Sequence, residues 1–425
     1  MEEAIQEKKH LSKDILWNTI GTFSYMFALW LVSIMTTNFL GYEQAGVFSL
    51  CLVASNIATS FGSYYVRVYY ASDINKRFSD AHYIWCRVST IAISVLVCGG
   101  YALALRYPWE VVGAIMLFYV YKVFELFTDI HSGTFQRYGK MYVCSILTTI
   151  KGVLSVAGFY VGAYWLKSLY WGFVFMIGVA GLTWVAELIF MKKLLNIVPN
   201  IKEFSIKAIG KLLWVCLPLF IVLLCSNVLP SIPKAMFERM YTTEEFGYYS
   251  SIATISVLIQ TAAGSVLMPI IPKIASAFQK KDFSSFWKLN GAILGLTVAI
   301  GGVAFVMVLF LGDWALKLVY GESILAHSYT FKWTVIAGTF TALFVVGNQL
   351  LAAIKDKYGM AVGSIVGTLV CLAISYPLCK YAYMDGISYA LIIAEAVEIA
   401  IFAGFMIYLV SKKKKEPEEI PSQEI

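Results

Sequence analysis

The sequence predicts an all-α membrane protein that crosses the bilayer about twelve times. Hydrophobic residues make up 59% of the 425 residues, charged residues make up only 14%, and the mean hydropathy is +0.73. The charges gather in short clusters between apolar runs of roughly twenty residues, the length of a helix that crosses the hydrocarbon core. A soluble domain of this size needs far more charge to cover its surface. A soluble globular fold is therefore excluded.

Twelve apolar runs are long enough to span the membrane, and a basic loop divides them into two halves of six. The halves cover residues 15–198 and 211–411, the loop covers 199–210, and polar ends lie at 1–14 and 412–425. We expect the spans at 15–37, 44–67, 82–104, 109–129, 142–164, 170–191, 211–233, 246–270, 287–310, 328–354, 358–378 and 387–411.

Positive charge is unevenly distributed between the two sides that these spans define. About 24 of the 33 Lys and Arg residues fall on the side of the N-terminus, including the run Lys412 to Lys415. The positive-inside rule then places both termini in the cytoplasm of a multi-pass plasma membrane protein. The formal charge of +7 thus follows from topology and from contact with anionic lipids, and no nucleic-acid partner is expected.

The two halves share three sequence landmarks in the same order, each pair on the same side of the membrane. With six spans per half, this pattern predicts a parallel repeat about an axis along the membrane normal. The alternative is chance recurrence in an aromatic-rich membrane protein. The pairs are Leu16-Trp17 with Leu213-Trp214, Gly41 to Ser49 with Thr243 to Ser250, and Arg137-Tyr138-Gly139 with Lys357-Tyr358-Gly359.

Ionisable residues inside the spans are candidates for function, because burying a charge in hydrocarbon is costly unless it is paired or hydrated. In the fourth span, spacings of three and four place Lys122, Glu125 and Asp129 on one helical face. A structural alternative is that Lys122 and Glu125 form an ion pair that ties helices together. In the last span, Glu395 and Glu398 lie near the midplane without a cation on their own face, so we expect them to face water or to hold a proton.

Further basic residues lie at several depths. Lys151 falls inside the fifth span, and Lys332 falls in the outer part of the tenth, from which it is able to snorkel outwards. Arg67 and Arg87 lie near the cytoplasmic ends of the second and third spans, where a structural role at the interface is the favoured interpretation.

The seventh span is irregular. Pro218, Pro230 and Pro233 interrupt it, Asn227 lies between them, and Lys234 stands at its outer end. Interrupted helices at membrane depth are tolerated only where the freed backbone faces protein or a water-filled cavity. We therefore expect this span to bend and to line a cavity.

Several functional classes lack their signatures. No Walker A motif or large soluble domain provides for nucleotide binding, and no long outer loop is available for a polymerase or transferase site. The four histidines and eight cysteines show no metal-ligand spacing. We expect no cofactor and no metal.

Several short motifs along the chain are shared with one family of membrane proteins. They are Leu16-Trp17-Asn18, Leu40-Gly41, Ala45 to Ser49, Ile232-Pro233-Lys234, Glu245 to Ser250 and Val319 to Glu322. In these motifs the chain resembles the polysaccharide-export branch of the multidrug/oligosaccharidyl-lipid/polysaccharide (MOP) superfamily, the Wzx-type flippases. The resemblance implies a MATE-like fold of two six-helix bundles around a partly cationic cavity, in which an undecaprenyl-pyrophosphate-linked oligosaccharide crosses the cytoplasmic membrane of a bacterium.

The combined prediction is a glycolipid flippase that works by alternating access and is not an enzyme. Polymerases or glycosyltransferases of the same pathway are candidate partners. A MATE-like drug/cation antiporter is the nearest alternative, and a membrane-embedded glycan polymerase or transferase is the alternative from another class. The predicted cationic cavity contains Lys122, Lys151, Lys234, Lys332, Arg67 and Arg87, and coupling to H⁺ or Na⁺ is assigned to Glu125, Asp129, Glu395 and Glu398.

Overall fold

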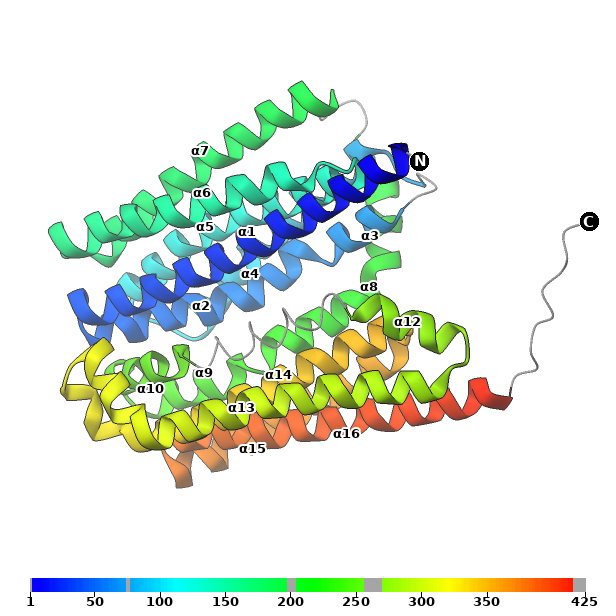
Figure 1. The fold of residues 1–425 in the computed structure, drawn as a ribbon. Helices are drawn as coiled ribbons and strands as arrows, with labels where there is room; N and C mark the ends of the chain where they lie inside the picture. Colours follow the sequence, from blue (N-terminus) through cyan, green and yellow to red (C-terminus); the bar gives the residue numbers. More distant parts are fainter. Residues whose placement is uncertain (1, 74–76, 197–203, 256–269, 416–425) are drawn as a thin grey trace, which may run out of the picture.

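The computed structural model describes residues 2–73, 77–196, 204–255 and 270–415, and these residues form helices joined by short connections (Figure 1). The N-terminal bundle comprises α1 Glu2–Leu40, α2 Tyr42–Ser63, α3 Val66–Ser72, α4 Asp80–Ala104, α5 Trp109–Arg137, α6 Met141–Tyr160, the π-helix η1 Val161–Trp165 and α7 Leu169–Leu195. The C-terminal bundle comprises α9 Ser231–Met240, α10 Thr243–Thr254, α12 Ile271–Gln279, α13 Phe283–Tyr320, the 3₁₀ helix η3 Ser323–Thr330, α14 Phe331–Ala353, α15 Lys357–Ala382 and α16 Asp385–Lys415. Helix α8, Ile206–Val228, connects them.

The predicted membrane architecture is confirmed. Within the described residues, eleven helical segments are long and apolar enough to cross a membrane, and their positions match the expected spans. The expected span 246–270 lies partly outside the described residues, and α10 forms its beginning. Large apolar side chains cover the outer surface, with Phe310 82% and Leu96 75% exposed, as a bilayer environment requires.

Polar side chains fix where helices begin. Thr242 and Glu245 form a reciprocal capping box at α10, and Asp356 accepts bonds from the backbone N–H groups of Tyr358 and Gly359 at α15. Such caps satisfy N–H groups that have no partner within the helix, which is obligatory where water is scarce. The capping residues therefore determine where each of these two apolar helices begins.

Helix α8 packs against both bundles. Its first half, through Ile209, Leu212 and Cys216, belongs to an apolar cluster with α3, α4 and α5, whereas Val222 belongs to the core of the C-terminal bundle. Pro218 lies between these two segments. The expected interruption follows at the end of the helix, because α8 ends at Val228 and a new helix, α9, begins at Ser231.

The bundles meet at the end opposite the start of α1 and the end of α16, and they diverge towards that other side (Figure 1). At the meeting point the Tyr42 and Tyr248 rings stack with centroids 3.9 Å apart, and the Asn38 amide donates to the Val319 carbonyl over 2.8 Å. A Cβ on Gly247 would lie 1.9 Å from the Tyr42 carbonyl oxygen, so only glycine permits this approach. We call this contact region the closed end.

The closed end joins the repeated landmarks of the sequence. Gly46 and Gly247 occupy corresponding places in the second pair of landmarks, and each faces the other bundle's backbone. A Cβ on Gly46 would lie 2.0 Å from the Thr243 carbonyl oxygen. The repeat thus places equivalent glycines on both sides of one interface.

Candidate functional site

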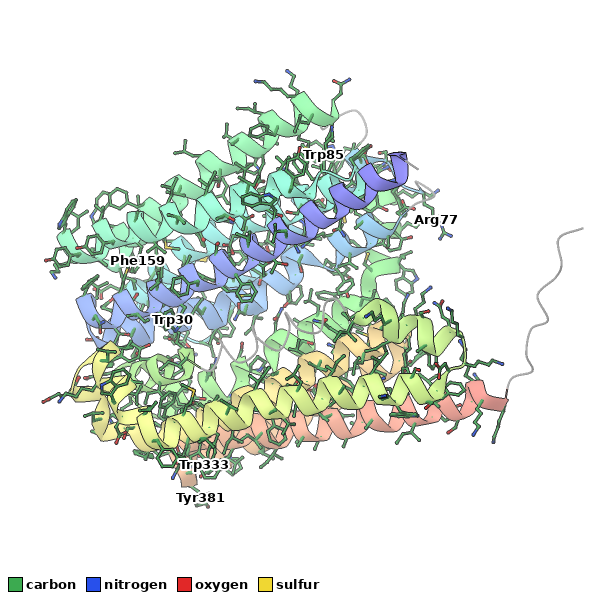
Figure 2. The ribbon with its side chains drawn as sticks, viewed as in Figure 1. Trp30, Arg77, Trp85, Phe159, Trp333 and Tyr381 are labelled. Carbon is green, nitrogen blue, oxygen red and sulfur yellow. The ribbon has the colours of Figure 1, made fainter. Side chains whose placement is uncertain are left out.

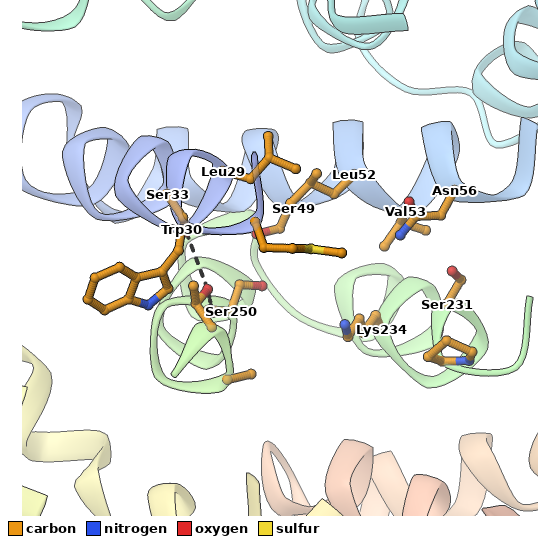
Figure 3. Close-up of a pocket in the computed structure, with 14 residues that line it drawn as sticks. Leu29, Trp30, Ser33, Ser49, Leu52, Val53, Asn56, Ser231, Lys234 and Ser250 are labelled. Atoms are coloured by element: carbon orange, nitrogen blue, oxygen red, sulfur yellow. Dashed lines mark hydrogen bonds between the residues drawn. The ribbon is translucent and has the colours of Figure 1, made fainter. Parts of the chain in front are cut away.

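A pocket of about 230 Å³ lies between the bundles, beside the closed end (Figure 3). Helices α1 and α2 form one wall, and α9 and α10 form the other. Lys234 is the single charged residue among the described residues that line it, and Figure 3 shows its amine directed into the pocket. The remaining lining is Met26, Leu29, Trp30, Ser33, Ser49, Leu52, Val53, Asn56, Pro230, Ser231, Ser250, Ala253 and Thr254.

The interruption between α8 and α9 positions Lys234. Pro230 lies in the connection and lines the pocket, and Lys234 follows one turn later on α9. The other two residues predicted to line a cavity here are not among the lining residues: Asn227 donates to the Ser60 hydroxyl over 2.9 Å, and Pro233 is buried. No hydrogen bond or ion pair joins Lys234 to another residue in the described part of the chain, so its amine is available to a ligand.

A second cavity of about 260 Å³ lies within the N-terminal bundle and contains a buried charge cluster. The Lys122 amine lies 2.9 Å from the Glu125 carboxylate, which also accepts a 2.7 Å bond from the Tyr25 hydroxyl. Lys151 approaches the same carboxylate at 3.7 Å. The predicted same-face pair of Lys122 and Glu125 is therefore an ion pair, and Lys151 and Tyr25 bring two further helices to it.

Asp129 holds the two predicted arginines of this bundle. Its carboxylate lies 2.6 Å from the Arg87 guanidinium and 3.3 Å from that of Arg67. Arg87 is fully buried, and it also donates to the Gly62 carbonyl oxygen over 2.5 Å. The three residues come from α3, α4 and α5, so this ion-pair group fastens three helices together.

The carboxylates of the last helix lie in the core of the C-terminal bundle. Glu395 accepts a 2.7 Å bond from the Thr341 hydroxyl, and it interacts electrostatically with Lys234. Glu398 is completely buried, and neither of its oxygens has a hydrogen-bond partner among the described residues. Its side chain packs against Gly367, where a Cβ would lie 2.1 Å from Cγ of Glu398. An unpaired acid at this depth either holds a proton or awaits a cation.

Lys332 stands apart from the other predicted residues. It is exposed, at the start of α14, and its amine lies 5.9 Å from the centre of the Trp333 ring. Trp333 and Tyr381 lie on the outer side of the C-terminal bundle (Figure 2). The structure therefore divides the predicted cationic cavity into Lys234 between the bundles, four basic residues within the N-terminal bundle, and Lys332 on the surface.

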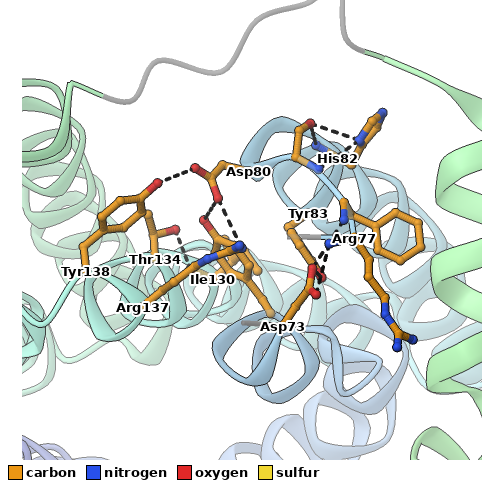
Figure 4. A network of polar contacts seen from close by, with 12 residues as sticks. Asp73, Arg77, Asp80, His82, Tyr83, Ile130, Thr134, Arg137 and Tyr138 are labelled. Atoms are coloured by element: carbon orange, nitrogen blue, oxygen red, sulfur yellow. Dashed lines mark hydrogen bonds and ion pairs between the residues drawn. The ribbon is translucent and has the colours of Figure 1, made fainter. Parts of the chain in front are cut away.

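A polar network within the N-terminal bundle joins side chains of α4 and α5 with Asp73 and Arg77, which lie between α3 and α4 (Figure 4). Asp80 accepts bonds from the hydroxyls of Tyr70 and Tyr138, each over 2.8 Å. Asp73 accepts from the Tyr83 hydroxyl over 2.8 Å and from the backbone of Arg77. Burial acts to raise the pKa of Asp73, but these donors outweigh it and hold that pKa below its ordinary value. The network is structural, because its groups bind one another.

Some residues of these sites carry no signal in the sequence. Tyr25, Trp30 and Thr341 are ordinary members of apolar helices, and only the fold shows that they contact the charged cluster, the pocket and Glu395. Within the described residues, no group of three or more His, Cys, Asp or Glu side chains is placed to hold a metal ion.

Comparisons with known proteins agree with this architecture. The family described as "Polysaccharide biosynthesis protein" matches residues 11–278. The chain is 21% identical over 319 residues to the capsular polysaccharide biosynthesis protein CapF of Staphylococcus aureus, covering 71% of this chain and 78% of that relative.

Solved transporter structures share the fold. An inward-facing multidrug resistance MATE transporter of the MOP superfamily matches with a TM-score of 0.73 and 11% identity, covering 95% of this chain and all of that one. The lipid II flippase MurJ in an inward closed conformation matches with a TM-score of 0.70 and 13% identity, covering 94% and 90%. A MOP superfamily transporter from Pyrococcus furiosus matches with a TM-score of 0.67 and 13% identity, covering 96% and 97%. The chain therefore belongs to the polysaccharide biosynthesis protein family, and its helices adopt the fold of the MATE transporters and of the flippase MurJ.

Proposed function

We propose that this protein moves an undecaprenyl-pyrophosphate-linked oligosaccharide, a precursor of a surface glycan such as O-antigen, capsule or a teichoic-type polymer, across the bacterial cytoplasmic membrane. The observation that carries the proposal is Lys234, a free amine in a pocket whose described lining has no other charge. A pyrophosphate that enters a low-dielectric site requires a nearby cation, and a lysine amine provides one with three donors. Alternating access then follows from opening and closing the two ends of the bundle interface.

The relatives support this substrate class. CapF is named for capsular polysaccharide biosynthesis, and MurJ is named as a flippase of lipid II. The Pyrococcus furiosus protein is described as having a binding pocket of reversed polarity that suggests a different function. A drug/cation antiporter requires a cavity that attracts cations, whereas the described lining of this pocket contains a lysine and no carboxylate.

Substitution of Lys234 tests the proposal. In proteoliposomes that contain a fluorescent polyprenyl-pyrophosphate-linked sugar, we expect Lys234→Ala to reduce flipping about ten-fold or more, since a bond to a charged group contributes about 1.5–3 kcal/mol. Lys234→Glu is expected to abolish flipping, and Lys234→Arg to retain part of it. Lys332→Ala is the matched control, because that lysine is exposed on the outer surface. Normal flipping by Lys234→Glu would refute the proposal.

The orientation belongs to the same proposal. Both termini are assigned to the cytoplasm from the distribution of Lys and Arg, which makes the described state one that is closed towards the outside. Reporter fusions at Lys281 are expected to be cytoplasmic and fusions at Glu244 external. The reverse result would invert the assignment.

Energy coupling is assigned to the buried carboxylates. A proton or Na⁺ that binds Glu395 or Glu398 in one state and leaves in the other shifts the balance between the two states. Glu395 is the stronger candidate for linking ion and substrate, because it interacts electrostatically with Lys234. Candidate protein partners are the polymerase or glycosyltransferases of the same pathway.

A further inference from the structure

The pocket between the bundles has two ends, and Lys234 lies towards only one of them. Figure 3 shows Lys234, Ser231 and Asn56 towards one end, and Trp30, Ser33 and Ser250 towards the other. The first group carries the charge, whereas the second combines one aromatic ring with hydroxyl groups. We call the second group, together with Thr254, the Trp30 end.

The Trp30 end contains polar groups with unused bonding capacity. The indole N–H of Trp30 is buried and has no acceptor among the described residues. The Thr254 hydroxyl donates to the Ser250 carbonyl over 2.7 Å and lies 3.3 Å from the Ser33 hydroxyl, so Ser33 is the donor of that pair and keeps its own lone pairs free. The indole nitrogen is enclosed, which leaves the ring and the hydroxyl groups of this end as the groups that line the pocket.

The chemistry of this end matches an uncharged sugar ring. A sugar offers apolar C–H groups to an aromatic face and hydroxyl or carbonyl oxygens to N–H and O–H donors. No carboxylate or second cation stands among the described lining residues to pair with a charged sugar. The volume of about 230 Å³ lies below the roughly 300–1,000 Å³ of drug-sized pockets, so the pocket suits one ring beside a phosphate group better than a whole oligosaccharide.

We infer that the Trp30 end binds the first, uncharged sugar of the lipid-linked glycan while Lys234 holds the adjoining phosphate. The inference rests on the proposed function, because it takes the pyrophosphate at Lys234 as its starting point. A neutral hexose or N-acetylhexosamine fits this end. A uronic acid at the same position leaves its carboxylate without a partner.

Binding of two lipids, one without and one with a sugar, distinguishes the roles of the two ends of the pocket. The purified full chain in nanodiscs is titrated with a short polyprenyl pyrophosphate and with the same lipid carrying one N-acetylhexosamine, and the Kd values are measured by microscale thermophoresis. We expect the sugar to tighten binding about ten-fold, the sum of one ring contact and one hydrogen bond to a hydroxyl group of this end. In Trp30→Leu that ratio is expected to fall to about one, and Trp30→Phe is expected to keep part of it.

The controls distinguish a failure of the sugar site from a failure of the proposed function. Trp214→Leu, at a tryptophan that is 75% exposed on the outer surface, is expected to keep the ten-fold ratio, and Lys234→Ala is expected to weaken both lipids. If the unaltered protein binds neither lipid, the proposed function fails. If it binds both equally, or if Trp30→Leu preserves the ratio, the sugar site is refuted while the proposed function stands.

Discussion

The two bundles differ in whether their buried charges are paired. In the N-terminal bundle, Lys122, Lys151 and Glu125 contact one another, as do Arg67, Arg87 and Asp129. In the described part of the C-terminal bundle, Glu398 has no hydrogen-bond partner, Glu395 has a hydroxyl, and the Lys234 amine faces a pocket.

This difference teaches which charges are available for function. When two buried charges are paired, their attraction offsets the free-energy cost of removing them from water. Removing one partner leaves the other buried without that compensation. An unpaired charge keeps the penalty until a ligand or a proton relieves it. Changes in the N-terminal bundle are therefore expected to alter stability first, and changes in the C-terminal bundle to alter transport first.

The largest effect is expected for Asp129→Ala. The substitution leaves Arg87 buried without its counter-charge and should lower the free energy of unfolding by about 3–5 kcal/mol. Thermal unfolding of the purified protein in detergent measures the loss, and Asp313→Ala, at an exposed aspartate of the other bundle, is the control. An unchanged Tm for Asp129→Ala would contradict the structural role of the arginine pair.

A smaller effect is expected where the two bundles touch. In Gly247→Ala the new methyl group meets the Tyr42 carbonyl oxygen, and overpacking of this kind costs about 1–3 kcal/mol. The cost falls only on the state in which the closed end is shut, so that end should open more often. Ser49→Cys in the pocket reports the opening through a membrane-impermeant thiol reagent.

Gly100→Ala is the control for that experiment, because no described residue lies within 4 Å of the position of its Cβ. We expect about ten-fold faster labelling from the closed side in Gly247→Ala and no change in Gly100→Ala. Equal labelling in both variants would show that the glycine contact does not hold the closed end.

Substitution of Glu395 and Glu398 is expected to change transport more than stability. Glu398→Gln removes a buried acid that has no hydrogen-bond partner among the described residues, so we expect the free energy of unfolding to change by less than about 1 kcal/mol or to rise. Transport by Glu395→Gln and Glu398→Gln is expected to slow and to lose its dependence on pH or Na⁺. Glu125→Gln, tested beside them, should instead lower the Tm. A normal rate and an unaltered ion profile in both C-terminal variants would assign these acids to packing.

The smallest effect is expected in the polar network of the N-terminal bundle. The pKa of Asp73 is held below its ordinary value of about 3.9, so its stabilisation is present above that pH and is lost as the pH falls through the lowered pKa. Asp73→Asn should cost about 1 kcal/mol at neutral pH. The difference in Tm between variant and parent should shrink as the pH is lowered from about 5 to about 3. A difference in Tm that is independent of pH would show that the Asp73 carboxylate does not stabilise the network.

The sequence predicted the helices better than it predicted the sites. Hydropathy located the spans because lipid solvates each helix separately, and the interruption at Pro230 was visible because proline lacks an N–H group. The pairing of Arg87 with Asp129 was not visible, because it depends on which faces of α4 and α5 are turned towards each other. Lys332 shows the same limit: depth in the sequence does not reveal whether a side chain faces a cavity or lipid.

Helix α8 has a mechanical consequence. Its first half is fixed to one bundle through Ile209 and Leu212, and Val222 is fixed to the other. The segment after Pro218 also contacts the first bundle, through the Asn227–Ser60 hydrogen bond and the stacking of Phe220 on Tyr64. Rocking of the bundles therefore loads this helix and these contacts together, and the helix bends most easily at Pro218, where the backbone bond to the preceding turn is missing.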